Sequence, residues 1–575
     1  MDNSFTHVAV QVPRLSGFDK SHQNLLTSKC GTITPILVDE LIPGSKIHLR
    51  LALSAQLPPL AADTFMRCQI KCEAFFVPWR LLAGSYESWF TDTQVSFQDS
   101  SNVFTDKVGF LPAIGNFGTA TGPDGTTPLH QVCQSTGSLM DYLGWRSGGA
   151  RLAAGAFSAG PLLAYHRCYD DWYRNTLVQR PVFVRPQFYQ SGLGSYNTNA
   201  PGSNLLRAGT SPYYFFTETL KDSTAASHQN YIFNTLASLR LADGAYLYEL
   251  RQRNFGLDYF TTATPTPQLG AAMVVGFGQD QNGAGDSSHF SIAALRAANS
   301  LQQFSERNQL SGVRYQDQIR ARYGANLSSG VAQRSLFLGG ATFDVYTKGI
   351  YQQSQDVVAG QTAGSISANT NNPFQNTTGA KFGSAAAAGA GLKISFEANE
   401  PGYLLVNATL VPKVTYASGI HKRWRHYVGA GSITDLANPI LQNVGPQPID
   451  ESELTGDNVG TVYGYTDRYA EFKTMEDELH GLVRDGESLE AFALQRSFVS
   501  GSNPRINSDF LKIPTNYMDQ VTAVTADLSN YGYWMDCYFD YKVAQPLAKY
   551  SLPSLQDPAY EHGRTIVMQK GGQKL

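Results

Sequence analysis

Charged residues are scarce in this chain of 575 residues. Asp, Glu, Lys and Arg make up 16% of the sequence, against about 25% of an average soluble domain. The 44 basic and 47 acidic residues nearly cancel, which leaves a formal net charge of −3. A dedicated DNA-binding domain carries a strongly basic face. The composition therefore excludes that class, although it leaves room for a local basic patch.

Cysteine is also rare, with six residues in the whole chain. A disulfide scaffold needs a much denser set. The closest pair, Cys68 and Cys72, would lie about 13 Å apart on a strand, whereas a disulfide needs Cα atoms within about 7 Å. We interpret the pair as buried apolar residues in a reducing compartment, with a metal or redox role as the alternative.

Export, membrane and catalytic signals are absent as well. The segment 1–14 has neither a basic start nor an apolar run, so it does not resemble a signal peptide. No stretch approaches the roughly 18 apolar residues of a membrane-spanning helix. We find no nucleophile elbow, zinc-protease motif or Walker loop. The sequence predicts a cytosolic protein without membrane insertion, catalytic residues, metal ligands or cofactors.

Aromatic residues and glycine are abundant instead. Phe, Trp and Tyr make up 12% of the chain, and there are 53 glycines. Tyr and Phe are favoured, and charge is depleted, where protein meets protein. An ordinary β-rich globule also favours aromatic strands and glycine-containing turns. The composition thus suits a subunit of an assembly, with a β-rich globule as the alternative.

Three long segments alternate between apolar and polar residues, which is typical of half-buried strands. They span residues 47–57, 66–76 and 531–543, and each has about twice the usual strand length. Because such strands lie near both ends of the chain, we predict a large antiparallel sandwich closed by its own termini. Shorter strands are expected at 181–188, 335–351, 392–396, 403–416 and 459–465.

Helices are expected to be few. Apolar residues recur at three- and four-residue spacing over 162–176, 292–304 and 315–323, and we expect these stripes to face the core. Gly324 supplies a C-terminal cap to the last stripe. Gly, Ala, Ser, Thr and Asn dominate residues 354–391, so we predict an extended loop there. No internal repeat is found, which argues against a propeller or solenoid.

One basic cluster stands out in this weakly charged sequence. It consists of six consecutive residues: His421, Lys422, Arg423, Trp424, Arg425 and His426. Cations beside an aromatic ring can bind a DNA backbone and stack a base. We therefore take the cluster as a candidate DNA contact, with a solvated strand end or a subunit contact as the alternative. Lys570 and Lys574 in the C-terminal tail are a second candidate.

The order of short motifs along the chain resembles the major capsid proteins of the Microviridae, especially the gokushovirus-like branch. The matching segments are FDKSH at 18–22, LIPG at 41–44, FFVPWR at 75–80, YDDWYR at 169–174, DYFT at 258–261 with PTPQ at 265–268, LR at 295–296 with RY at 314–315 and YG at 323–324, LGG at 338–340 with YQQS at 351–354, and YGYTDRYAEF at 463–472. Thr266 stands where the family usually has Trp. The resemblance covers residues 18 to about 475.

The resemblance implies a mainly β fold: an eight-stranded antiparallel jelly roll, the viral β-barrel, with long loop insertions and a few short helices. It implies an N-terminal arm over 1–44, one jelly-roll domain over 45–548 and a C-terminal tail over 549–575. The expected insertions lie at about 81–180, 191–290, 354–391 and 429–458.

The same resemblance implies a structural protein and not an enzyme. Identical copies would form a T=1 icosahedral capsid around a circular single-stranded DNA genome, assembled in the bacterial host cytoplasm. Expected partners are other copies of the chain, the packaged DNA, a small basic DNA-binding protein, pilot or minor virion proteins, and a host surface receptor. The implied location is the virion.

Two other classes of function stay open at this point. A β-sandwich carbohydrate- or receptor-binding module of a phage would share the aromatic loops and the missing catalytic motifs. A carbohydrate-active enzyme would need paired carboxylates, which a sequence cannot place. Asp170 and Asp171 are not such a pair, because adjacent residues on a helix point about 100° apart.

The outer surface is expected to differ from that of the apparent relatives. Many gokushovirus capsid proteins are thought to carry a long insertion that builds a protrusion at the three-fold axis. Here the corresponding interval, 269–290, would reach at most about 36 Å as a straight hairpin. We predict a low cap there. Surface protrusions and host attachment are expected at 91–160 or 192–244, with the alternative that those segments lie between subunits or face inward.

Overall fold

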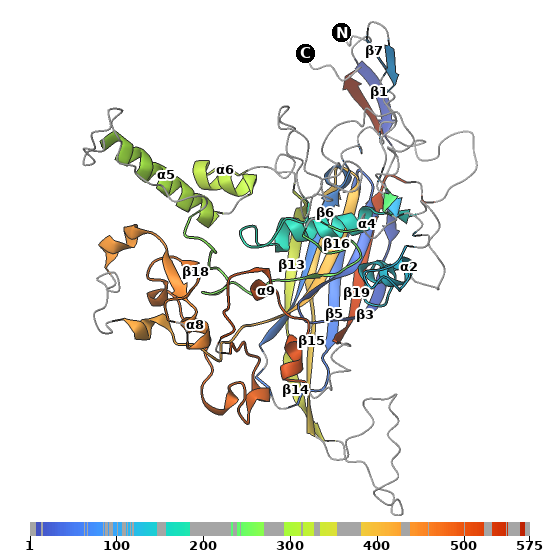
Figure 1. The fold of residues 1–575 in the computed structure, drawn as a ribbon. Coiled ribbons are helices and arrows are strands. Elements are labelled where there is room, and N and C mark those ends of the chain that lie inside the picture. The colour runs from blue at the N-terminus through green and yellow to red at the C-terminus, as the bar shows by residue number, and fades with distance from the viewer. Residues whose placement is uncertain are drawn as a thin grey trace, which may run out of the picture.

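The computed structural model describes most of the chain, in segments separated by gaps. These segments are mainly β, with largely antiparallel sheets and few helices, consistent with a β-sandwich (Figure 1). The described residues are 7–12, 15–61, 64–65, 67–83, 86, 90, 96–99, 102–105, 111, 113–114, 117, 120–145, 157–183, 232–233, 239–241, 243–268, 292–311, 314–326, 334–352, 381–426, 438–457, 459–499, 501–522, 532–547, 549 and 564–569.

The three alternating segments form the strands β5 (Ser45–Gln56), β6 (Cys68–Pro78) and β19 (Tyr533–Gln545). Every second residue of β5 and β19 is buried, and the residues between them are exposed or half-buried. This is the two-residue period of a pleated strand with one face on a core. The prediction of long half-buried strands at both ends of the chain is confirmed.

β5 and β19 are neighbours in a six-stranded sheet of order β14-β15-β5-β19-β2, and β3 also pairs with β19. The other strands are β2 (Ser16–Asp19), β3 (His22–Ser28), β14 (Tyr346–Gln352) and β15 (Lys381–Ala398). Phe539 of β19 pairs with His22 on one side and with Leu51 on the other. The two ends of the chain therefore meet in one sheet, as the sequence predicts.

A five-stranded sheet has the order β12-β4-β16-β6-β13. Its strands besides β6 are β4 (Thr32–Leu41), β12 (Arg251–Gln252), β13 (Leu336–Asp344) and β16 (Gly402–Pro412). Every residue of β16 is buried, so both faces of this sheet are covered. The strands predicted at 335–351, 392–396, 403–416 and 459–465 correspond to β13 with β14, β15, β16 and β18; residues 181–183 form no strand, and 184–188 lie outside the described residues.

The main hydrophobic core joins side chains from both large sheets. It includes Leu49 and Leu51 of β5, Leu404 and Val406 of β16, and Phe539 of β19. Burying one such side chain contributes about 1.5–3 kcal/mol. Cys68 and Cys72 lie in this core, and all six cysteines are buried free thiols, which confirms the interpretation of this pair as buried apolar residues.

A second core covers the other face of the five-stranded sheet. The helix α4 (Gly160–Cys168) packs there, with Leu162 and Tyr165 against Phe75 of β6 and Leu405 of β16. Tyr165 donates a 2.7 Å hydrogen bond to the carbonyl of Ile33 in β4. A Cβ at Gly160 would lie 2.6 Å from the Trp79 ring, so only glycine lets α4 begin this close to the sheet.

The extended loop predicted over 354–391 is wrong for its last part, because residues 381–391 belong to β15. Small residues are needed in this strand: a Cβ at Gly389 would lie 2.9 Å from Phe343 of β13. The segment gains its stability from backbone pairing with β5 and β14. A sequence with few large side chains can therefore be a strand where two sheets approach closely.

Three predicted helices are present. α4 continues into a π-helical turn, η2 (Tyr169–Tyr173); α5 spans Ile292–Ser311 and α6 spans Tyr315–Tyr323, which Gly324 caps with φ +68°. The expectation that the stripe over 292–304 faces the core is wrong, since Leu301 and Phe304 are about half exposed. Short helices are η1 (Trp79–Leu81), α2 (Leu129–Cys133), α3 (Leu139–Tyr142), η6 (Lys422–Arg425), η8 (Pro439–Val444), α8 (Ser452–Thr455), η9 (Ala470–Phe472), η10 (Gly481–Val483), η11 (Glu490–Phe492), α9 (Ser508–Leu511) and η12 (Tyr517–Gln520).

Smaller sheets complete the fold. β1 (His7–Val12) pairs with β20 (Arg564–Gln569), so the two termini lie together (Figure 1). The others are the pair β7 (Ser96–Asp99) and β8 (Asn102–Thr105), the sheet of β9 (Ala113–Ile114), β10 (Phe157–Ser158) and β11 (Ile232–Phe233), and the pair β17 (Gln447–Asp450) and β18 (Val462–Thr466). Within 1–44, β2, β3 and β4 are strands of the large sheets. The interval 269–290 lies outside the described residues, as does most of 192–244.

Candidate functional site

The basic cluster lies on η6, a short 3-10 helix that follows β16. His421 begins the helix, and its ring accepts a 3.1 Å hydrogen bond from the backbone N–H of Arg423. Just before it, the backbone N–H of Ile420 donates to the carbonyl of Ser452 at 2.9 Å. η6 is therefore held against α8 and the β17–β18 pair, and it is not the strand end considered from the sequence.

Gly419 makes this close approach possible. Its φ is +103°, a conformation that L-residues with a side chain rarely adopt, and a Cβ would lie 2.0 Å from the carbonyl oxygen of Glu453. Only glycine accommodates both constraints at this position. The chain thus turns immediately before the cluster and lays η6 directly on the backbone of α8.

Two of the cluster's three permanent cations are paired with carboxylates. Arg425 forms an ion pair with Asp450 and also donates to Ser452 Oγ at 3.0 Å. Arg423 lies 3.4 Å from Glu478. The ammonium of Lys422 donates to the carbonyl of Pro448 at 2.8 Å. Much of the positive charge is therefore compensated within the subunit.

The aromatic member of the cluster is open to solvent. Trp424 is 68% exposed, and the guanidinium of Arg423 lies 5.0 Å from the centre of its ring. A cation above an exposed indole leaves the other ring face available for stacking. Trp424 and Lys422 are thus better placed to meet a partner than Arg425.

Beneath η6 lies a group of buried carboxyl groups that the sequence did not single out. Burial raises the pKa of Glu453 to about 7, despite hydrogen bonds from the Asp450 backbone and the Tyr259 hydroxyl. Glu471 lies 3.1 Å from His426. Burial is also the main cause that lowers the pKa of His421. These acids come from segments 25–60 residues downstream, where no charge pattern in the sequence marks them.

The second candidate contact, Lys570 and Lys574, lies outside the described residues. Asp170 and Asp171 form ion pairs with Arg174 and Arg167 on the same helical segment, at 2.6 and 3.0 Å. Each carboxylate therefore has a structural partner one helical turn away, so neither faces the other as the two acids of a hydrolase do.

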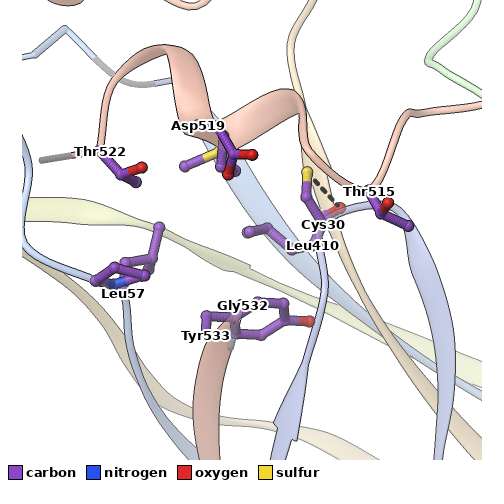
Figure 2. Close-up of a pocket in the computed structure, with 10 residues that line it drawn as sticks. Cys30, Leu57, Leu410, Thr515, Asp519, Thr522, Gly532 and Tyr533 are labelled. Atoms are coloured by element: carbon purple, nitrogen blue, oxygen red, sulfur yellow. Dashed lines mark hydrogen bonds between the residues drawn. The ribbon is translucent and has the colours of Figure 1, made fainter. Parts of the chain in front are cut away.

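Two cavities in the described segments are candidate ligand sites. The smaller, of about 20 Å³, lies beside β19 and is lined by Cys30, Leu57, Leu410, Asp519 and Tyr533 (Figure 2). It has room for about one water molecule. The larger is an open groove of about 660 Å³ that includes Asp258, Asp467 and Glu476. Its Asp477 already bridges Arg67 and Lys413.

Across the described segments, no group of three or more His, Cys, Asp or Glu side chains has the geometry to hold a metal ion. In the same segments, no helix is both long and apolar enough to span a bilayer. What the described chain does present is a set of exposed large apolar side chains: Phe65, Leu257, Trp424, Ile440, Met475 and Val499. Such residues are typical of surfaces that contact other proteins.

Comparison with known proteins agrees with this picture. A family model described as "Capsid protein (F protein)" matches residues 7–555. The capsid protein VP1 of Chlamydia phage 1 is 25% identical over 97% of this chain and 98% of its own length. VP1 of Bdellovibrio phage phiMH2K is 24% identical over 95% and 97%, and VP1 of Spiroplasma virus 4 is 22% identical over 93% and 94%. The chain therefore belongs to the capsid protein (F protein) family, in the gokushovirus-like branch of the Microviridae.

Proposed function

We propose that this major capsid protein forms, from identical copies, a small T=1 icosahedral shell that encloses a circular single-stranded DNA genome. The observation that carries the proposal is the match to phage capsid proteins over nearly the whole chain. The family is a structural one, and in this role the subunit acts by shape and contact and not by catalysis. Assembly takes place in the bacterial host cytoplasm, and the product is the virion.

The strand order supports an eight-stranded jelly roll as the core of the subunit. A jelly roll has two four-stranded antiparallel sheets, and the chain crosses from one sheet to the other after most strands. β3, β19, β5 and β15 are neighbours in one sheet, and β4, β16, β6 and β13 in the other. In this arrangement the remaining segments are insertions between strands of one domain, with a C-terminal tail.

Exposed apolar residues supply the energy of assembly. Leu257, Phe65 and Val499 are at least 80% exposed in the single subunit. Removing apolar surface from water contributes about 25 cal/mol per Å². Contacts between copies that cover these side chains therefore stabilise the shell, while the sparse charge keeps the cost of desolvation low.

We expect the purified full-length protein to assemble into closed particles when its scaffolding or minor virion partners are supplied. Sedimentation velocity and electron microscopy measure this directly. A chain that stays monomeric in the presence of those partners, and is absent from purified virions, contradicts the proposal. Small discrete oligomers that bind glycans would instead favour a receptor-binding module.

The particle is expected to survive reducing agents, because the six cysteines are buried free thiols. Burial raises the pKa of Cys68 to about 12, so this thiol stays protonated and unreactive near neutral pH. Dithiothreitol should leave the sedimentation coefficient unchanged, and mass spectrometry should find the mass of the fully reduced chain. A stoichiometric disulfide together with disassembly on reduction would refute this prediction.

The residues His421, Lys422, Arg423, Trp424 and Arg425 remain the proposed DNA contact, and Lys570 and Lys574 are a second proposal of equal rank. The exposed ring of Trp424 beside Arg423 supports the first proposal. The ion pair of Arg425 with Asp450 limits it, because that cation already has a partner in the subunit. Packaged DNA, a small basic DNA-binding protein, pilot proteins and a host receptor complete the proposed partners.

We expect Arg423→Ala with Arg425→Ala to lower DNA retention or particle yield while the subunit still folds. Nucleic-acid content is read from the absorbance ratio of gradient-purified particles, and folding from circular dichroism. Asp450→Asn is the matched control, since it breaks the same ion pair but keeps both cations. Normal packaging by the double variant, or an equal loss in the control, would show that the cluster acts only within the subunit.

A further inference from the structure

The helix α5 lies beside α6 and away from the sandwich (Figure 1). Its more buried positions are polar or small: Ala298, Gln302, Ser305 and Glu306. Gln302 donates to Glu306 at 2.8 Å and also to Gln268. The more buried side of α5 is therefore polar, and Gln302 ties the helix to Gln268.

A second side of α5 is exposed and carries apolar residues next to arginines. Ala297, Leu301 and Phe304 follow one another at four- and three-residue spacing, which places them on one stripe. Leu301 is 50% exposed and Phe304 is 46% exposed. Arg296 and Arg307 are exposed along the edge of this stripe. We call these five residues the α5 outer face.

An outer face of this kind needs a partner. Most of the stability of a helix in a protein comes from packing of its apolar stripe and not from intrinsic propensity. In the 20-residue helix α5 the Leu301 and Phe304 side chains are about half exposed, so part of that contribution is missing. On α6, Arg322 lies 4.5 Å from the Phe304 ring, which adds positive charge to the same surface.

A complementary surface occurs elsewhere on the same chain, in residues 481–490, which we call the acidic loop. The backbone N–H of Leu489 donates to the carbonyl of Leu482 at 2.9 Å, so these two leucines lie close together. They are 39% and 56% exposed. The exposed carboxylates Glu487 and Glu490 accompany them. The acidic loop thus presents two apolar side chains with three exposed acids, Asp485, Glu487 and Glu490, and one exposed cation, Arg484, against the apolar side chains and two arginines of the α5 outer face.

The geometry points to a contact between two copies: we propose that the α5 outer face of one subunit docks on the acidic loop of a second. Both surfaces are exposed in the single chain, so they do not satisfy each other within it. A contact between two different patches is head-to-tail, and such contacts close into rings around a rotation axis. This inference rests on the proposed assembly of the shell, and it assigns one of its interfaces.

A charge-swap cycle on the full-length chain tests the contact. Arg296→Glu with Arg307→Glu places like charges against the acidic loop, and Glu487→Arg with Glu490→Arg does the same from the other side. Each double variant should lower the yield of sedimenting particles at least about tenfold. The quadruple variant restores opposite charges and should recover most of the yield. Circular dichroism of each soluble subunit reports folding.

Lys393→Glu with Lys542→Glu is the control for the arginine variant, because it changes the net charge by the same amount as Arg296→Glu with Arg307→Glu, at exposed positions of the six-stranded sheet. It should leave particle yield near that of the parent chain. Normal assembly of both double variants, or no recovery in the quadruple variant, overturns the inference. Loss of packaged DNA from normally assembled Arg296→Glu, Arg307→Glu particles overturns it in favour of a nucleic-acid contact.

The outcome for the parent chain separates this inference from the proposed function. A parent chain that forms particles, with variants that all do so equally well, leaves the shell function standing and removes the interface. A parent chain that never assembles with its partners present removes both. Only a recovery of particle yield in the quadruple variant supports the interface. If the arginines had a purely structural role, charge changes in the distant acidic loop would not restore the yield.

Discussion

Replacing Gly419 by alanine is expected to lower the free energy of unfolding by about 3–5 kcal/mol. The new Cβ would lie 2.0 Å from the carbonyl oxygen of Glu453, in a backbone conformation with φ +103°. The obstructing atom belongs to the backbone, so no side-chain rotation relieves the contact. The turn must open, and the hydrogen bond from Ile420 to Ser452 is lost with it.

Thermal or denaturant unfolding of the soluble subunit measures this effect. Gly456→Ala is the matched control, because Gly456 also has a positive φ, +83°, but no atom within 4 Å of a new Cβ. The control should cost only about 1 kcal/mol. Equal losses in the two variants would mean that backbone strain alone matters, and that the approach of η6 to α8 contributes nothing.

The sequence identified the basic cluster but not its surroundings. Consecutive cations are visible in a linear chain, whereas the carboxylates that pair with them, Asp450 and Glu478, lie 25 and 55 residues away. No periodicity links such distant positions. The turn at Gly419 brings them together, and one glycine among 53 carries no signal of that kind. The pairing of Arg425 and Arg423 with these carboxylates leaves less free positive charge for a DNA contact than the sequence suggests.

The sheets were predictable where one face is buried and the other faces solvent. β5 and β19 alternate cleanly, and the sequence located both. The Gly- and Ala-rich half of β15 does not show this alternation, because it packs against Phe343, where larger side chains do not fit. The sequence therefore did not predict it as a strand. The sequence predicts the apolar stripe of α5 at the correct residues. Its expected position in the core is wrong, because Leu301 and Phe304 are about half exposed. A helix that packs on another copy of a chain has the same pattern as a helix that packs on its own domain.

The second large effect is a dependence of stability on pH that originates at Glu453. Burial holds the pKa of this carboxyl at about 7 in the folded subunit, against an ordinary value of 4.5. Between these values the folded state keeps a proton that the unfolded chain has lost. The contribution of Glu453 to the free energy of unfolding is therefore largest below about pH 4.5. It falls as the pH rises through 7.

The charged groups around Glu453 set the size of this effect. Desolvation raises the pKa, while the backbone hydrogen bond from Asp450, the positive charge of Lys422 and the hydrogen bond from Tyr259 oppose that rise. The folded state loses at most about 3 kcal/mol of stability between pH 4.5 and 8 from this single site. Other carboxylates, such as Glu73 paired with Arg253, act in the opposite direction at lower pH.

Glu453→Gln isolates the contribution of this site, because the amide has nearly the same shape as the protonated acid and never ionises. Its carbonyl can accept from the Asp450 backbone, and its N–H₂ can donate to the Tyr259 hydroxyl oxygen. We expect the variant to be more stable than the parent chain at pH 8 and similar to it at pH 5. Unfolding midpoints measured across this range provide the comparison, with the exposed Glu487→Gln as the control. If the unfolding midpoints of the parent chain and of Glu453→Gln depended on pH in the same way, the group that titrates would be a residue other than Glu453. The expected convergence at low pH instead identifies Glu453 as a buried acid that weakens the support of η6 as the solution becomes alkaline.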